Sequence, residues 1–159
     1  MQKKLKIGWF SFSCSEDSTI VFTELLNDHF SQWSKLIEFQ HVRILKKNNT
    51  LKGLDVAFVE GAIASTRDAQ KLKEIRKNCK RLVAIGSCAV NGMPSAQRNV
   101  FDPKQKKEIE FLIKRFHMAK KVRTLAQVVK VDDQVSGCPM NETVFLQIVD
   151  KYLKEFKAA

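Results

Sequence analysis

The sequence predicts an α/β domain built on a parallel sheet, and three observations support this fold class. Short apolar strands alternate with amphipathic helices along the chain. Two of the predicted strands, residues 54–59 (LDVAFV) and 81–85 (RLVAI), are largely apolar, which is typical of strands covered on both faces. The chain also has 159 residues, 44% of them hydrophobic and 28% charged, which suits one globular domain with its own core.

The first half of the chain supplies two further strands and a long helix. Residues 5–12 (LKIGWFSF) predict the first strand, and residues 39–45 predict the second, which ends in the polar turn 46–49. Residues 18–33 between them have helical periodicity. Most of the apolar stripe of this helix is expected to come from Ile20, Val21, Leu25 and Phe30.

The second half repeats the alternation. We expect a helix at 66–78 with Ala69, Leu72 and Ile75 turned inward, and a long loop at 91–103, which contains glycine, proline and asparagine. A short last strand is expected at 128–131. Two more helices complete the pattern: residues 104–117, with Ile109, Leu112, Ile113 and Phe116 on one face, and residues 141–156, with Val144, Phe145, Ile148, Val149 and Leu153 on the inner face.

Strands that alternate with helices in this way are joined by right-handed crossovers, which place helices on both faces of a parallel sheet. The pattern shows no internal repeat and no low-complexity segment. We therefore predict one doubly wound, flavodoxin-like α/β domain over residues 1–159.

The net charge of +11 does not by itself indicate nucleic-acid binding. The lysines are scattered over predicted helix faces, aromatic residues are not interleaved with them, and no helix-turn-helix or zinc-finger spacing occurs. Solvated helix faces are the main explanation for this charge. An acidic partner subunit is the next explanation, and nucleic acid the last.

The apolar runs are of strand length, so we expect no membrane span. The basic N-terminus is followed by a strand and not by a cleavage site, and this favours a cytoplasmic protein without a signal peptide. Disulfides are therefore not expected among the four cysteines. No CxxC pair occurs, so neither a zinc ribbon nor a thioredoxin motif is supported.

Three of the cysteines occupy equivalent places in the predicted fold. Cys14, Cys88 and Cys138 each follow a predicted strand closely. The loops that follow parallel strands emerge at one edge of the sheet, where ligands bind in open α/β folds. We therefore expect these thiols to gather in space. Cys79 lies near the end of a predicted helix and is interpreted as a structural residue.

The neighbours of these thiols favour a metal site over three buried small residues, although cysteine is often buried for packing alone. Gly86 and Gly137 precede Cys88 and Cys138, where the backbone needs positive φ or close approach to a bulky group. Pro139 is expected in the first turn of the last helix, whose N-terminus would favour a thiolate. Zinc usually draws on closely spaced ligand pairs, whereas a cubane iron–sulfur cluster accepts ligands from separate loops. The cluster is preferred.

Three segments resemble a known family. Residues 55–63 (DVAFVEGAI), 83–90 (VAIGSCAV) and 137–139 (GCP) are similar, in matching order, to the small subunit of nickel–iron hydrogenases and to the related 20 kDa-type subunit of respiratory complex I. The resemblance implies a flavodoxin-like domain that holds a proximal [4Fe–4S] cluster facing a large subunit with nickel and iron. It also implies that Cys88 and Cys138 are cluster ligands.

The sequence departs from the family where the other two ligands are expected. The family has an N-terminal CxxC or two adjacent cysteines there, and this chain has only Cys14. If Cys14 matches the first cysteine of CxxC, Asp17 stands at the position of the second. A carboxylate can bind iron, so Asp17 is the preferred fourth ligand. The alternatives are Ser11, Ser13, Ser15 and the adjacent Glu16. Asp17 would otherwise only cap the helix that begins near Ser18.

Two functions from different classes follow from the resemblance. The first is an electron-transfer subunit with one [4Fe–4S] cluster on Cys14, Asp17, Cys88 and Cys138, docked to a hydrogenase-like large subunit and passing electrons to an acceptor, which can be a further subunit. No cysteine follows Cys138, so at most one cluster is expected. The second is a cluster-free scaffold or regulatory module for a large-subunit homologue.

Flavin binding is a third hypothesis with less support than these two, because Glu16 and Asp17 would repel a phosphate after the first strand. Arg98 lies in a loop that could face the partner or only solvent.

Overall fold

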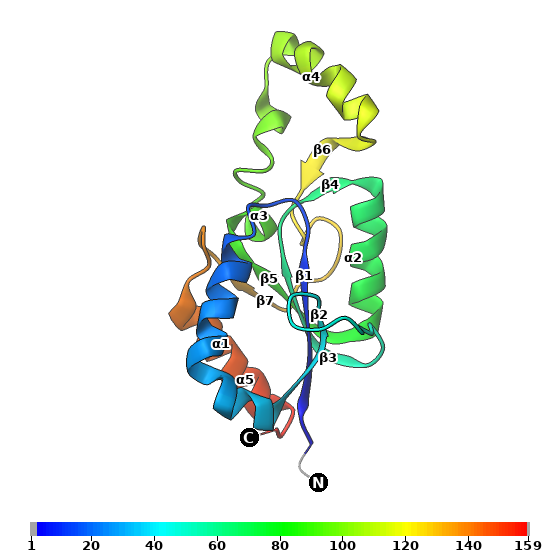
Figure 1. Ribbon diagram of the computed structural model, residues 1–159. Helices are drawn as coiled ribbons and strands as arrows, with labels where there is room; N and C mark the ends of the chain where they lie inside the picture. The colour runs from blue at the N-terminus through cyan, green and yellow to red at the C-terminus, as the bar shows by residue number, and fades with distance from the viewer. Residues whose placement is uncertain (1–2, 159) are drawn as a thin grey trace.

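A five-stranded parallel sheet organises the chain, as the sequence predicts (Figure 1). The computed structural model describes residues 3–158. The strand order is β2-β1-β3-β5-β7, and every neighbouring pair is parallel. The bounds are Leu5–Ser11 for β1, Ile37–Val42 for β2, Leu54–Glu60 for β3, Cys79–Ile85 for β5 and Asp133–Val135 for β7. The order reverses at β1, so loops on its two sides diverge and leave room for ligands at the carboxyl edge.

Helices cover both faces of this sheet (Figure 1). The helices α1 (Asp17–Leu36) and α5 (Glu142–Glu155) lie on one face, and α2 (Thr66–Asn78) lies on the other. The core on the α1 side is aromatic: Trp9 stacks on Phe22 with ring centroids 4.3 Å apart. Apolar burial against both faces of the sheet is the main force that holds the elements together.

One crossover lacks a helix. Residues 43–53 connect β2 to β3 as a loop that passes over β1 (Figure 1). The short helix α3 (Gly86–Val90) directly follows β5. Among residues 3–158, no helix is long and apolar enough to cross a membrane.

An arm projects beyond the carboxyl edge of the sheet (Figure 1). It contains the 3-10 helix η1 (Gln97–Val100), the helix α4 (Pro103–Arg115) and the strand β6 (Met118–Arg123), which pairs antiparallel with β4 (Ile63–Ser65). The sequence did not predict β4 or β6. The helix α4 is near the predicted position, and none of its residues is buried in the described chain.

Several local predictions were wrong. In α5, Val144 is exposed and not on the inner face as predicted. Residues 128–131 do not form the last strand, because Val128 and Val129 donate their backbone N–H groups to Leu125 in a turn. These valines pack against the core as turn residues, and β7 begins only at Asp133. In α1, Ile20 and Phe30 are exposed. The buried face of α1 instead includes Val21, Phe22, Leu25, Leu26 and Trp33.

Candidate metal centre

The carboxyl edge of the sheet brings Cys14, Cys88 and Cys138 together. Cys14 follows β1, Cys88 lies in α3 directly after β5, and Cys138 lies in the turn after β7. All three line one small recess of about 20 Å³, together with Asp17 and Glu16. The spatial gathering follows from the topology, because β1, β5 and β7 point in the same direction.

The three thiols differ in exposure. Cys88 is buried, Cys14 is partly buried, and Cys138 is exposed at the rim. Ser95 donates from Oγ to Cys88 Sγ at 3.2 Å, and Cys88 Sγ lies 3.4 Å from the carbonyl oxygen of Met93. Burial and the charge of Glu60 raise the pKa of Cys14 to about 12, and Cys88 also contributes. Without a cation beside it, Cys14 is therefore held as a neutral thiol.

Asp17 lies against Cys138 and does not cap the helix. Its Oδ2 is 3.7 Å from Cys138 Sγ and accepts a hydrogen bond of 2.8 Å from Ser15 Oγ. Asp17 is the first residue of α1, and the capping position belongs to Glu16, which has a φ of 62° and makes no side-chain capping bond. The carboxylate of Asp17 therefore interacts with Ser15 and Cys138 and not with the helix backbone as a cap.

The other oxygen candidates are placed differently. Ser15 and Glu16 line the recess with Asp17. Ser11 donates to Glu60 at 2.9 Å, and Ser13 exchanges backbone hydrogen bonds with Ala62. Ser11 and Ser13 do not line the recess.

Two glycines shape the loops around the thiols. Gly86 and Gly137 have φ values of 79° and 122°, in the region that favours glycine, as the sequence predicts. A Cβ on Gly137 would lie 2.3 Å from the carbonyl oxygen of Pro139. Pro139 is not in the first turn of the last helix, because α5 begins at Glu142 with Asn141 as its cap. The pKa of Cys138 is raised by partial desolvation and by the charge of Asp17, although the side chain is exposed at the rim.

Glu60 is a buried acid that sequence reasoning did not assign to the site. It is the last residue of β3, is 2% exposed, and lines the recess with the thiols. Thr19 and Ser11 donate to its Oε1 at 2.6 and 2.9 Å, and burial raises its pKa. A charged residue at the carboxyl end of a mostly apolar buried strand is the signal that could have identified it.

The thiols of the recess come from three separate segments of the chain. Within residues 3–158, no three histidine, cysteine or acidic side chains are grouped so that they could bind one metal ion. A cluster binds each ligand to a different iron atom and so accepts donors that are further apart. The recess, of about 20 Å³, is smaller than a cubane cluster.

Two other residues lie apart from this site. Cys79 is buried at the amino end of β5, the opposite edge of the sheet, which agrees with a structural role. Arg98 does not face outward. It donates from Nη2 to the carbonyl oxygens of Ala64 and Ala119 and so connects the base of the arm.

Comparison with known proteins places these features in context. The family described as NADH ubiquinone oxidoreductase, 20 Kd subunit, matches residues 14–152. The chain is 28% identical over 172 residues to a subunit of the F420-non-reducing hydrogenase of Methanothermobacter marburgensis, covering 97% of this chain and 55% of that protein. It is 30% identical over 111 residues to the delta subunit of the NAD-reducing hydrogenase HoxS of Cupriavidus necator, covering 60% and 53%. The chain thus spans about half the length of these relatives.

Solved structures agree with the fold. A chain of an NAD+-reducing [NiFe]-hydrogenase in the H2-reduced state superposes with a TM-score of 0.83 at 21% identity, covering 96% of this chain and 93% of that one. A chain of the actinobacterial-type NiFe-hydrogenase from Ralstonia eutropha H16 superposes with a TM-score of 0.65 at 15% identity, covering 96% and 54%. At these identities the likeness supports the architecture alone.

Proposed function

The chain belongs to the family of the NADH ubiquinone oxidoreductase 20 Kd subunit, and on this premise we propose that it is an electron-transfer subunit of a hydrogenase-like oxidoreductase. The observation that carries the proposal is the recess at the carboxyl edge, where three thiols from distant parts of the chain meet. Its relatives include subunits of hydrogenases. The family implies a single [4Fe–4S] cluster, which would supply one-electron reduction and oxidation.

Cys14, Cys88 and Cys138 would hold the cluster as thiolates. Burial and neighbouring negative charge raise the pKa values of Cys14 and Cys138 while no cation is present. Iron binding removes that penalty, because it stabilises the deprotonated ligands. The hydroxyl of Ser95 donates to Cys88 Sγ, and such hydrogen bonds to ligand sulfurs tune a cluster's potential.

Asp17 would be the fourth ligand. Its carboxylate lies beside Cys138. The recess is lined by three cysteines, so Asp17 would supply the ligand that a fourth cysteine would otherwise provide. Ser15 holds this carboxylate by a hydrogen bond, as outer residues commonly orient a ligating carboxylate. Glu16 lines the same recess and is the competing ligand.

A partner subunit is part of the proposal, because the arm exposes large apolar side chains. Val100, Phe111 and Phe116 are 82%, 62% and 63% exposed, although such side chains are usually covered. The arm projects from the same edge of the sheet as the proposed cluster (Figure 1). A large subunit seated there would cover both the arm and the exposed Cys138, and electrons would then pass on to an acceptor.

Anaerobic reconstitution tests this function. The purified chain is incubated with ferrous iron and sulfide, desalted, and assayed for iron, acid-labile sulfide and the EPR signal after reduction. We expect about four iron and four sulfide per chain and the signal of a reduced [4Fe–4S] cluster. A reconstituted protein without bound iron would contradict the proposal.

The second candidate is a cluster-free scaffold that docks a large-subunit homologue. It is favoured by the missing fourth cysteine and by the small size of the recess. Co-purification with a hydrogenase-type large subunit expressed together with this chain separates the two candidates. A scaffold binds that subunit equally well in the Cys88→Ala and wild-type forms and contains no iron in either form.

A further inference from the structure

A second cavity, separate from the thiol recess, opens over the carboxyl ends of β1 and β2. Its volume is about 600 Å³, within the range of small-molecule sites. It exists because the connection from β2 to β3 is a loop, residues 43–53, where a helix would otherwise fill this part of the sheet face. The cavity lies at the carboxyl edge of the sheet, where open parallel sheets bind ligands.

One wall of the cavity is aromatic. The rings of Phe10 and His41 stack with centroids 4.3 Å apart and an interplanar angle of 28°, and Phe12 lines the cavity beside them. Burial lowers the pKa of His41, so its ring is neutral near pH 7. A neutral aromatic wall of this kind stacks well with another planar ring.

The remaining lining is rich in positive charge. Arg43 and Lys47 come from the end of β2 and the following loop, and neither has an ion pair among residues 3–158. Lys71 comes from α2 and shares its charge with Glu74 at 2.9 Å. Glu16 is the one acidic residue that lines the cavity in the described chain, and it stands where the cavity adjoins the thiol recess.

We propose that this cavity binds a phosphorylated planar ring, the chemistry that mononucleotides share. The ring lies along Phe10, His41 and Phe12, and the phosphate binds Arg43 and Lys47, with Lys71 in support. Unpaired cations beside an aromatic wall suit this ligand, because guanidinium and ammonium groups form strong charge-assisted hydrogen bonds with phosphate. This site goes beyond the proposed electron-transfer function and does not depend on a cluster.

The cavity is connected to the thiol recess through hydrogen bonds. Ser11 and Thr19 line the cavity and both donate to Glu60, which lines the recess. A ligand in the cavity therefore sits one hydrogen-bonded step from the proposed metal centre.

Calorimetric titration of the purified full chain tests the proposal with four probes. AMP and FMN each carry a phosphate on a different planar ring, adenosine has a ring without phosphate, and inorganic phosphate has no ring. We expect AMP or FMN to bind at least about tenfold more tightly than adenosine and inorganic phosphate, because ring and phosphate contacts add. The mononucleotide that binds identifies the preferred ring.

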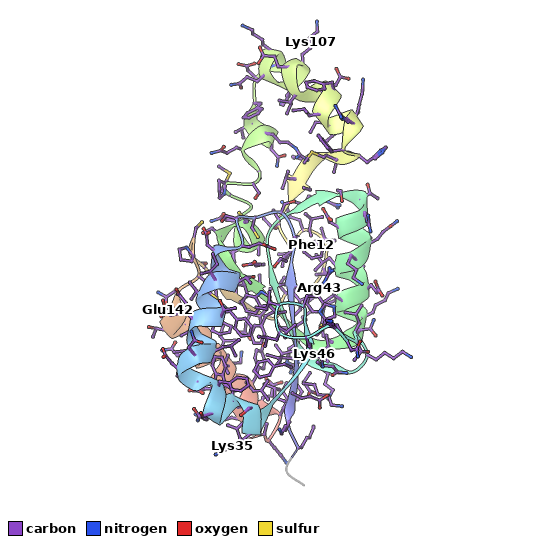
Figure 2. The ribbon with its side chains drawn as sticks, viewed as in Figure 1. Phe12, Lys35, Arg43, Lys46, Lys107 and Glu142 are labelled. Atoms are coloured by element: carbon purple, nitrogen blue, oxygen red, sulfur yellow. The ribbon has the colours of Figure 1, made fainter. Side chains whose placement is uncertain are left out.

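A matched pair of loop variants provides the control. Arg43→Ala combined with Lys47→Ala removes two lining cations. Lys46→Ala removes a lysine of the same loop (Figure 2), and this lysine does not line the cavity. We expect the double variant to weaken binding at least about tenfold and Lys46→Ala to change it less than about twofold. The proposal is overturned if neither mononucleotide binds, or if Lys46→Ala weakens binding as much as the double variant does.

Discussion

The two ends of strand β3 carry buried acids that are satisfied in opposite ways. Asp55 and Glu60 are each 2% exposed. At the amino end, Asp55 forms an ion pair with Lys80 at 2.7 Å and accepts a hydrogen bond from the backbone of Lys6. At the carboxyl end, Glu60 accepts from the hydroxyl groups of Ser11 and Thr19 and has no ion pair among residues 3–158, and burial raises its pKa.

The cysteines repeat this contrast. Cys79, at the amino end of β5, packs in the core and lies 3.6 Å from the guanidinium of Arg76. Cys88, just beyond the carboxyl end of the same strand, lines a recess with two other thiols. At the amino edge, Asp55 and Cys79 lie beside the cations Lys80 and Arg76. At the carboxyl edge, Glu60 and Cys88 instead contact hydroxyl groups. A buried acid or thiol without a counter-charge is the pattern that we propose marks the functional edge of this chain.

The largest expected effect separates Cys79, at the start of β5, from Cys88, in the helix α3 directly after β5. Cys88→Ala should reduce the iron content of the reconstituted protein to background, because it removes a proposed ligand. Cys79→Ala should keep full iron content and lower the free energy of unfolding by about 1–2 kcal/mol, since it leaves a small cavity. Iron analysis and urea unfolding of both variants measure these effects, and equal iron content in the two would remove the contrast.

The next effect concerns glycines at and away from the site. Gly137→Ala should lower the free energy of unfolding of the metal-free protein by about 3 kcal/mol, because its φ is 122° and a Cβ would meet a carbonyl oxygen. Gly53→Ala is the control: its φ is 71°, but a Cβ there meets open space. This variant should lose only about 1 kcal/mol. If urea unfolding gives similar losses of free energy for the two variants, the stability of the protein does not depend on glycine in the tight turn before Cys138.

A smaller effect tests the two acids of β3. Asp55→Asn should lower the free energy of unfolding of the metal-free protein by about 1–2 kcal/mol, because the buried carboxylate loses its ion pair with the partly exposed Lys80. Glu60→Gln should change it by less than about 0.5 kcal/mol, since an amide oxygen still accepts from Ser11 and Thr19. Urea unfolding near pH 7.5 compares the two variants. A greater loss of unfolding free energy in Glu60→Gln than in Asp55→Asn would show that Glu60, and not Asp55, is the acid that stabilises the fold.

The smallest effect is a pH dependence at the carboxyl end of β2. Burial, with Lys71 and Arg43 nearby, lowers the pKa of His41 in the folded protein. The unfolded state then binds more protons, so His41 contributes stability above about pH 6.5 that is lost as the pH falls. His41→Gln should therefore show a smaller decrease in melting temperature between about pH 7.5 and pH 5.5 than the wild type. An unchanged pH dependence would mean that His41 titrates normally.

The sequence was sufficient for four of the five strands of the main sheet, because buried strands and amphipathic helices have distinct periodicities. It failed at residues 128–131, where three valines match a strand pattern but pack as turn residues against the core. It also missed β6, because strand Met118–Arg123 is half lysine and arginine and pairs only with the short β4. Tertiary pairing of such segments has no local signal.

The candidate site was predictable in part for a similar reason. The convergence of Cys14, Cys88 and Cys138 follows from strand direction, which the alternation of elements fixes. The role of Glu60 depends on which groups surround it after folding. The same is true of the cavity beside Phe10 and His41, which arises from a missing crossover helix.

The central claim is that the carboxyl edge is a four-ligand site completed by Asp17, and EPR of reconstituted Asp17 variants tests it most directly. We expect Asp17→Ala to lose the [4Fe–4S] signal, Asp17→Cys to keep it with an altered spectrum, and Glu16→Ala to match the wild type. Asp17 touches Cys138 and has no capping role that could explain such a loss. A wild-type spectrum in both Asp17→Ala and Asp17→Cys would contradict the account.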